Sequence, residues 1–385
     1  MPQHRFASVH VVGTNGKSSV ARMTAALIEA HGVPSGAYLS PHQERWSEQV
    51  LIGGDEIEPE RFAAAVQRVA DSAAAVNRTL DEGESVTQFE AVTAAAFVAL
   101  AGAGVHVGVI EAGLGGRLDA TNVIPSRVCA LTSVGLEHTE WLGSTLEEIA
   151  AEKLAVLRDH SILVLGELDA GVEAFARRVA TERHATVVTA RPNPALELRA
   201  RGPYQRRNFA VALACAEAIL GRLDPAAAVR VAQTLEVPGR MEVTGSDPPL
   251  ILDAAHNPDG ARALAEALGE VAGTALVVAC IAMLEDKDAE GIVAALAPAL
   301  DLAVCTELPP DRLAGSGRPG ASALSHERLA EICAEAGLPA EAVRGPDAAI
   351  QRALDEARLR AGMALCTGSH YLLSYARAAV PSEPG

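Results

Sequence analysis

Short apolar runs alternate with longer alanine-rich stretches along the first half of this 385-residue chain. The runs have the length and β-branched composition of buried strands, and the stretches between them have the length of helices. The expected strands are residues 9–12, 105–110, 128–133 and 162–165, and the expected helices are residues 18–30, 87–100 and 145–157. This alternation is typical of βαβ units, so we predict an α/β fold with a mostly parallel sheet.

A second series of strand-like runs follows a polar stretch that begins with Pro238, Gly239 and Arg240. Its expected strands are residues 250–253, 275–280, 302–306 and 364–367. Because the chain is longer than one typical domain, we place a boundary at residues 238–249. We predict a larger N-terminal domain, residues 1–238, and a smaller Rossmann-like α/β domain, residues 246–385.

Charge and composition narrow the possible partners. The 49 acidic and 32 basic residues give a net charge of −17, which repels a phosphate backbone, so we expect no nucleic-acid partner. No apolar run is long enough to span a membrane and no signal-peptide pattern is visible, so we expect a cytoplasmic protein. We also expect a monomer whose partners are small molecules. The six cysteines lie far apart without a CxxC pair, which favours buried reduced thiols.

The first expected strand leads directly into a glycine-rich loop and then a helix, which is the context of a phosphate-binding loop. Its glycines let backbone N–H groups converge on phosphate oxygens, and the helix N-terminus adds partial positive charge. The GxxxxGK[ST] pattern would need a glycine where Val11 stands, so the loop is a shortened variant, and a plain strand-to-helix turn is the alternative. We predict that ATP binds to the loop Gly13-Thr14-Asn15-Gly16-Lys17-Ser18, with Lys17 at the terminal phosphates.

Two polar side chains follow expected strands. Glu111 comes after residues 105–110, and His138 comes soon after residues 128–133. In open α/β sheets, ligands bind beyond the carboxyl ends of the strands. A carboxylate there and a serine of the loop offer the oxygen ligands that Mg²⁺ prefers. We predict that Glu111 binds magnesium and that His138 contacts a metal ion or a phosphate; a solvated glutamate and a surface histidine fit the same positions.

Lysine is rare in this chain, since only Lys17, Lys153 and Lys287 are lysines among 32 basic residues. The bias suggests that lysine stands where a compact or chemically modifiable amine is needed. Lys153 lies in the expected helix 145–157, with apolar residues three and four positions away. Its position alone fits either a side chain that reaches the surface or one that faces a partly buried site.

Two further polar clusters stand at expected helix starts. Thr87 and Glu90 fit a capping box, and this structural role is enough to explain them. Asp253 ends the second domain's first expected strand, and His256 and Asn257 follow it directly ahead of a helix. Because this cluster also lies at a strand end, it is a second candidate ligand site.

In this order, the motifs resemble the Mur ligase superfamily and, within it, folylpolyglutamate synthase, including its bifunctional dihydrofolate synthase form. The run Gly-Gly-Arg-Leu-Asp-Ala-Thr-Asn at 115–122 points to the folate branch rather than to the peptidoglycan ligases. The resemblance spans residues 9 to about 373. It also rests on Gly-Thr-Asn-Gly-Lys at 13–17, Leu-Ser-Pro-His at 39–42, Thr-Gln-Phe-Glu at 87–90, Glu-His-Thr at 137–139, Glu-Lys at 152–153, Pro-Gly-Arg at 238–240, Asp-Ala-Ala-His-Asn-Pro at 253–258, Asp-Lys-Asp at 286–288 and Thr-Gly-Ser at 367–369.

The resemblance implies an ATP-dependent carboxylate–amine ligase of folate biosynthesis. A carboxylate would attack the γ-phosphate of ATP, and the amino group of L-glutamate would then displace phosphate from the acyl phosphate. The N-terminal domain would be the ATP-binding central-type domain, and the C-terminal domain would be the glutamate-ligase domain. The resemblance also implies two Mg²⁺ ions and a carbamylated Lys153, with Lys17, His138 and Lys153 as catalytic residues.

The site residues that the resemblance implies fall into three sets. The metal ligands are Ser19 or Ser18, Ser40, Glu111, His138 and Lys153. The ATP contacts are Gly13, Thr14, Asn15, Gly16, Lys17, Ser18, Ser19, Asn208, Arg240 and Asp253. The substrate contacts are Thr87, Phe89, Glu90, Leu118, Asp119 and Ala120 for the pterin-bearing acid, and His256 and Ser369 for glutamate.

Some positions depart from the family pattern. Family members usually read Gly-Lys-Gly-Ser where this chain reads Gly-Lys-Ser-Ser at 16–19, and Glu137 replaces a usual aspartate. They carry a few dozen residues before the loop, part of which contacts dihydropteroate, whereas 12 residues precede Gly13 here. The acid therefore stays open between dihydropteroate and reduced folate. A Mur-type ligase for a non-folate acid and a non-ligating ATP-binding regulatory protein are the alternatives.

Overall fold

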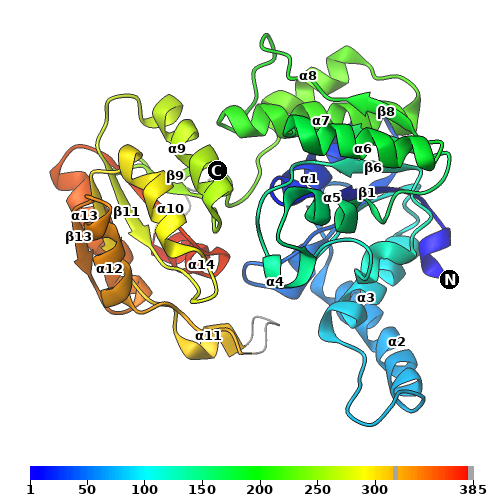
Figure 1. Ribbon diagram of the computed structural model, residues 1–385, viewed down its shortest axis with the longest axis horizontal. Helices are drawn as coiled ribbons and strands as arrows, with labels where there is room; N and C mark the ends of the chain where they lie inside the picture. Colours follow the sequence, from blue (N-terminus) through cyan, green and yellow to red (C-terminus); the bar gives the residue numbers. More distant parts are fainter. Residues whose placement is uncertain (315–319, 380–385) are drawn as a thin grey trace. The chain divides into compact units, whose positions relative to one another are not determined.

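The computed structural model describes residues 1–314 and 320–379, and Figure 1 labels its helices and strands. The chain forms two compact units. The first holds residues 1–199 and 205–235, and the second holds residues 200–204 and those from 236 onward. Each unit has its own mostly parallel sheet flanked by helices, which confirms the predicted α/β class.

The sheet of the first unit has the strand order β4-β3-β2-β5-β1-β6-β7-β8. The six strands in the order β2-β5-β1-β6-β7-β8 run parallel to their neighbours. The pairs β2–β3 and β3–β4 are antiparallel. The strands are β1 (Ala7–Val12), β2 (Ser35–Tyr38), β3 (Val50–Ile52), β4 (Asp55–Glu56), β5 (Val107–Glu111), β6 (Val128–Leu131), β7 (Ile162–Leu165) and β8 (Thr186–Thr189).

Helices cover both faces of this sheet. Ile110 of β5 packs with α2 and α3, and Leu131 of β6 packs with α5 and α6 on the same face, because these residues are in register with His10 and Val12 of β1. Side chains alternate across a strand, so Glu111 points to the opposite side from Ile110, towards the start of α1. The helices are α1 (Lys17–Ala30), α2 (Pro59–Asn77), α3 (Gln88–Ala103), α4 (Thr139–Leu142), α5 (Leu146–Leu154), α6 (Ala170–Glu182), α7 (Pro203–Leu220) and α8 (Pro225–Thr234), with 3₁₀ turns η1 (Pro2–His4), η2 (Trp46–Gln49) and η3 (Ala120–Val123).

The sheet of the second unit has the order β13-β12-β11-β14-β10-β9, and its β9–β10 pair is antiparallel. Apolar residues on the two faces of the sheet form two separate clusters with the helices. The strands are β9 (Glu242–Thr244), β10 (Leu250–Leu252), β11 (Val277–Ile281), β12 (Leu302–Cys305), β13 (Ala340–Ala342) and β14 (Met363–Thr367). The helices are α9 (Pro258–Ala272), α10 (Ala289–Leu296), η4 (Ala297–Ala299), α11 (Pro310–Ala314), α12 (His326–Glu335), α13 (Pro346–Leu359) and α14 (His370–Ala379).

Element bounds agree with the apolar pattern to within a few residues. The strand at residues 162–165 has the predicted bounds, whereas β6 ends at Leu131 because Thr132 and Ser133 turn to bond the loop after β1. All six cysteines are buried and free of disulfides, as expected. In the described part of the chain, helices of sufficient length and apolarity to cross a membrane are absent.

Candidate active site

The loop after β1 adopts backbone conformations that require glycine. Gly16 has a φ of +85° and stands immediately before Lys17, the first residue of α1. A Cβ atom at Gly16 would lie 2.5 Å from Asn208 Oδ1, and one at Gly13 would overlap Thr132 Oγ1. Asn208 of α7, one of the predicted ATP contacts, therefore lies directly against the loop. The loop is therefore held tightly between α7 and the end of β6.

Backbone and side-chain hydrogen bonds attach the loop to the segment after β6. Thr14 N donates to Ser133 O at 2.9 Å, and Asn15 N donates to Ser133 Oγ at 2.9 Å. Gly135 N donates to Thr14 Oγ1 at 3.0 Å. These bonds fix the loop at the start of α1, where the helix dipole favours an anion.

Two lysines meet at this loop, one from its own helix and one from α5. Lys17 Nζ donates to Gly13 O and Thr14 O, each at 3.1 Å, and Lys153 Nζ donates to Gly13 O at 2.9 Å. Lys153 is only 4% exposed. Burial and the Lys17 ammonium lower the pKa of Lys153 from 10.5 to about 7, against the smaller opposing effect of Glu137 and Asp119. A large fraction of Lys153 is therefore a neutral amine at pH 7.

Glu111 is 1% exposed and accepts two hydrogen bonds from neighbouring segments. Ser18 Oγ donates to its Oε1 at 2.9 Å, and Ser40 N donates to its Oε2 at 3.0 Å. Ser19 lies one helix position further and is fully buried, and its hydroxyl has no partner within the described residues. The structure thus brings the Ser18 hydroxyl and the Ser40 backbone N–H to Glu111, whereas the Ser19 hydroxyl does not bond to it.

His138 stands at the start of α4 with a left-handed φ of +52°. Its Nε2 lies 3.7 Å from Glu137 Oε1, and both side chains are mostly buried. A non-glycine residue with positive φ is uncommon and marks a position where the surroundings hold the backbone. A histidine and a carboxylate thus lie together on the segment after β6 that is also hydrogen-bonded to the loop after β1.

Asp119 is held by the residues around it. Its Oδ2 accepts from Leu114 N at 2.9 Å, and its Oδ1 accepts from Thr121 N at 2.9 Å and from Thr121 Oγ1. Thr121 Oγ1 in turn lies 2.8 Å from His10 Nε2. Burial, aided by the Arg158 charge, lowers the pKa of His10 to about 3, so this histidine is neutral. Sequence reasoning missed His10, because a lone polar residue in a strand carries no pattern.

The other predicted contacts for the acid substrate differ in their surroundings. Thr87 and Glu90 form the predicted capping box at the start of α3, with Thr87 Oγ1 accepting from Glu90 N at 3.2 Å. Phe89 packs so closely on Gly113 that a Cβ there would lie 2.5 Å from its ring. Leu118 is 93% exposed and directly precedes Asp119, the N-cap of η3, which begins at Ala120. An exposed leucine of this kind offers apolar area to a ligand.

In the second unit, a buried carboxylate follows β10. Asp253 is 3% exposed, and its Oδ2 accepts from Tyr204 Oη at 2.6 Å and from Met241 N at 3.0 Å. Burial raises the pKa of Asp253, and the Arg240 charge opposes that rise. The Tyr204 partner was not predicted, because the two residues lie 49 positions apart.

The predicted glutamate contacts lie on two neighbouring strand ends of the same unit. His256 Nδ1 is 2.8 Å from Ala254 O, and its ring is 5.2 Å from the ring of His370. Ser369, which follows β14, is buried, and its Oγ accepts from Tyr371 N at 3.3 Å. Because β10 and β14 are parallel neighbours, His256 and Ser369 follow the same edge of the sheet.

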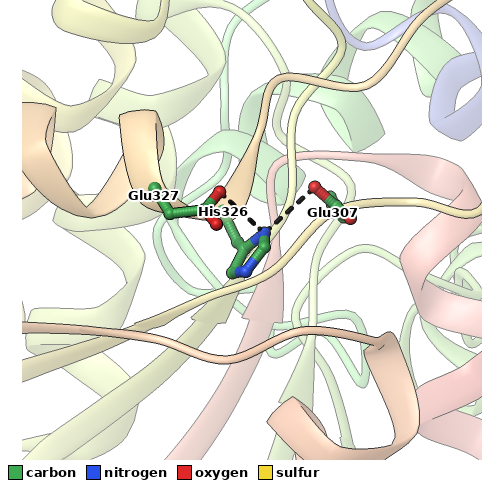
Figure 2. Close-up of side chains that lie close together, drawn as sticks. All are labelled: Glu307, His326 and Glu327. Carbon is green, nitrogen blue, oxygen red and sulfur yellow. Dashed lines mark hydrogen bonds and ion pairs between the residues drawn. The ribbon is translucent and has the colours of Figure 1, made fainter.

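A further cluster that sequence reasoning missed lies at the start of α12, as Figure 2 shows. His326 Nδ1 is 3.0 Å from Glu307 Oε2 and 3.1 Å from Glu327 Oε2. The hydrogen bond from His326 lowers the pKa of Glu307, and Arg344 Nε lies 3.7 Å from its other oxygen. The cluster has the donor types of a metal site, but these mutual ion pairs account for it.

The fold and the comparisons first define the class of protein. The family model described as "Mur ligase, glutamate ligase domain" matches residues 239–370, which contain the Asp253 and His256 cluster. This match places the segment 239–370 in the class of Mur-type ligases.

A curated relative then gives the particular family. The dihydrofolate synthase/folylpolyglutamate synthase of Mycobacterium tuberculosis is 34% identical over 346 residues, which cover 79% of this chain and 71% of the relative. The chain belongs to the dihydrofolate synthase/folylpolyglutamate synthase family, as the resemblance predicted.

Solved structures agree with this family. A Mycobacterium tuberculosis folylpolyglutamate synthase complexed with ADP and AMPPCP superimposes with a TM-score of 0.90 and 31% identity, covering 100% of this chain and 93% of that protein. E. coli FolC in complex with DHPP and ADP gives 0.83 and 26%, covering 98% and 90%. A bifunctional folylpolyglutamate synthase/dihydrofolate synthase with Mn, AMPPNP and L-glutamate bound gives 0.82 and 30%, covering 97% and 89%.

Proposed function

We propose that this chain adds L-glutamate to a folate-type carboxylate, either dihydropteroate, a reduced folate or both, and releases ADP and phosphate. The observation that carries the proposal is the convergence of Lys17, Lys153 and Glu111 around one phosphate loop. Family membership and relatives that bind ADP, DHPP and L-glutamate support the same activity.

The reaction has two steps. A carboxylate oxygen of the acid attacks the γ-phosphorus of ATP, and the bond to the β-phosphate oxygen breaks as ADP leaves. The amino group of L-glutamate then attacks the acyl carbon, phosphate leaves with the bonding electrons, and the nitrogen loses a proton. Lys17 and the N-terminus of α1 would stabilise the charge that develops on the transferred phosphoryl group. Because hydrogen bonds already hold the loop in place, its N–H groups need little reorganisation to stabilise this charge.

We propose that residues around the loop hold two Mg²⁺ ions. Glu111 offers a buried carboxylate, and Ser40 and His138 belong to segments that adjoin the same loop. Either Ser18 or Ser19 of α1 would supply a serine ligand to the metal. The hydrogen bond between Ser18 and Glu111 favours Ser18. Ser19 is the alternative, because its buried hydroxyl has no partner within the described residues. The metal would neutralise charge on the phosphates, and manganese in a similar solved structure supports a divalent site.

We further propose that Lys153 is carbamylated. A neutral amine attacks CO₂, a nitrogen–carbon bond forms, and one proton is released, which turns the side chain into a carboxylate-like metal ligand. A pKa of about 7 supplies the neutral amine that this reaction needs. ¹³C NMR with ¹³C-bicarbonate should show a carbamate resonance that is absent from Lys153→Met, and an identical spectrum for both proteins would exclude the modification.

The remaining assignments follow the family pattern. We propose residues 1–238 as the ATP-binding domain and residues 246–385 as the glutamate-ligase domain of a monomer. The ATP contacts would be Gly13, Thr14, Asn15, Gly16, Lys17, Ser18, Ser19, Asn208, Arg240 and Asp253. The acid would contact Thr87, Phe89, Glu90, Leu118, Asp119 and Ala120, and glutamate would contact His256 and Ser369.

One assay tests both substrate and activity. ADP release is followed with dihydropteroate or tetrahydrofolate, with and without L-glutamate, and the products are identified by mass spectrometry. We expect ADP release that needs both the acid and glutamate, and a product larger by one glutamyl residue. If ADP is released with neither dihydropteroate nor tetrahydrofolate as substrate, the proposal is refuted. ADP release in a control that contains no acid at all would support a non-ligating ATPase. The rate ratio between the two acids tells whether the enzyme is bifunctional.

A further inference from the structure

A cavity of about 570 Å³ lies at the amino ends of β6 and β7, on the far edge of the sheet from the phosphate loop. Its lining includes Arg127, which directly precedes β6, and Ser161, which directly precedes β7. Arg127 N donates to Ser8 O near the start of β1, whereas the loop follows the end of that strand at Gly13. At the usual rise per strand residue, the two places are roughly 16 Å apart. The cavity is therefore separate from the candidate active site.

Two arginines give this cavity positive charge. In the described part of the chain, the Arg127 guanidinium makes neither a hydrogen bond nor an ion pair. Arg158 donates to the carbonyl oxygens of Asn122 and Ile124 and to Asn122 Oδ1, and no carboxylate pairs with it among the same residues. The acid of the lining, Asp159, is already 3.2 Å from Arg183 Nη1. Neither guanidinium charge at the cavity is therefore compensated by a carboxylate within the described residues.

A buried hydroxyl in the lining supplies an independent observation. Ser126 is 3% exposed, and within the described residues its Oγ has no hydrogen-bond partner. An unpaired buried hydroxyl costs free energy, so such groups usually have a partner when the site is filled. Val123, Ile162 and Ala218 add an apolar wall to the same lining.

We propose that this cavity binds a small organic anion, whose carboxylate or phosphate group meets Arg127 and Arg158 and whose apolar part packs on Val123 and Ile162. Its volume is within the range of small-molecule sites. An anionic group would compensate both guanidinium charges, and Ser126 would donate its hydroxyl hydrogen to the ligand. Arginine suits this task because its planar fork binds either group with two parallel hydrogen bonds.

Occupancy of the cavity bears on the acid-binding segment of the proposed ligase. Arg158 holds the backbone of η3 at Asn122, and η3 begins directly after Asp119. A ligand that competes for this guanidinium weakens its hold on η3. This consequence rests on the proposed function, whereas binding to the cavity does not.

Binding is measured directly, by titration calorimetry and ligand-observed NMR, on the full chain with saturating Mg²⁺ and ADP to fill the phosphate loop. The probes are benzoate, phenyl phosphate and the neutral benzamide. We expect saturable binding of at least one anion, at least tenfold weaker binding to Arg127→Ala, and no comparable binding of benzamide. A preference for benzoate or for phenyl phosphate tells which anionic group the cavity takes.

Matched variants make the test decisive. Arg68→Ala removes an exposed arginine of α2 and should leave anion binding unchanged. Ser126→Ala should weaken binding several-fold without lowering the melting temperature of the free protein, because it removes an unpaired hydroxyl. Equal affinities in Arg127→Ala and Arg68→Ala, equal binding of benzamide and benzoate, or no saturable binding up to about 10 mM would each overturn the proposal. None of these results depends on ligase turnover.

Discussion

Replacing Lys153 by methionine should stabilise the first unit at neutral and acidic pH. Lys153 is 4% exposed, and its pKa falls from 10.5 in the unfolded chain to about 7 in the folded one. The unfolded state therefore binds more protons between pH 7 and pH 10.5, and the free energy of unfolding rises with pH across that window. Below pH 7 the full penalty for burying the charge is present. Methionine keeps a similar length and carries no charge.

The size of the effect follows from the same shift. One pKa unit corresponds to about 1.36 kcal/mol, so the penalty on the charged form is at most about 5 kcal/mol. The variant also loses the hydrogen bond from Lys153 to Gly13 O, which contributes about 1 kcal/mol. At pH 6 we expect Lys153→Met to be more stable than the wild type by about 2–4 kcal/mol. At pH 10.5 it should be equal or less stable by about 1 kcal/mol.

Urea unfolding in CO₂-free buffer, followed by tryptophan fluorescence, measures this difference. Both tryptophans, Trp46 and Trp141, lie in the first unit, so the signal reports on that unit alone. Other titrating groups cancel when the variant is subtracted from the wild type at each pH. Lys153→Arg is the matched control, because its charge persists at every pH and should make it less stable than Lys153→Met throughout. A difference between wild type and Lys153→Met that is the same at pH 6 and pH 10.5 would refute the reasoning.

Three other substitutions test the candidate site. Glu111→Gln keeps the shape of the side chain but removes the charge beside Ser18. The Mg²⁺ concentration for half-maximal ATP turnover should therefore rise at least tenfold. An unchanged magnesium titration contradicts the metal role. Gly16→Ala adds a Cβ at 2.5 Å from Asn208 Oδ1 on a backbone with φ of +85°, so calorimetry should show weaker ATP binding and urea unfolding a loss of about 1–3 kcal/mol. Normal ATP affinity in that variant would argue against the loop. Leu118→Ser changes a side chain that is 93% exposed, so stability should stay within about 0.5 kcal/mol while the KM of the acid rises; the reverse pattern would remove Leu118 from the substrate site.

Local patterns predicted a large part of the fold. The strand at residues 162–165 was predicted with its observed bounds, because a short β-branched run in a parallel sheet is buried on both faces. The capping box of Thr87 and Glu90 was also predictable, since its partners are three residues apart. The edge strands β4 and β13 were missed because they have only two and three residues and contain no β-branched or large apolar residue. Such strands form through pairing with a neighbour, which leaves little trace in their own sequence.

The candidate site divides in the same way. Glu111 and His138 were predicted as site residues because they follow strands, and ligands of open α/β sheets bind beyond the carboxyl ends of the strands. The choice between Ser18 and Ser19 was not predictable, since it depends on which side of α1 faces β5. The contact of Tyr204 with Asp253 and the cluster of Glu307, His326 and Glu327 involve distant residues without a recognisable spacing.

The sequence by itself determined the α/β class, the glycine-rich turn between the first strand and helix, the strand-end positions of the polar residues and the resemblance to the ligase family. These features depend on period, spacing and residue type, which are local properties of the chain. Only the tertiary structure decided that Lys153 is buried beside Lys17 with a pKa of about 7, and that Arg127 and Arg158 line one cavity. The physical reason is that burial and the distance between charges depend on how remote segments pack, and these quantities set the protonation of an amine and the electrostatic potential of a cavity.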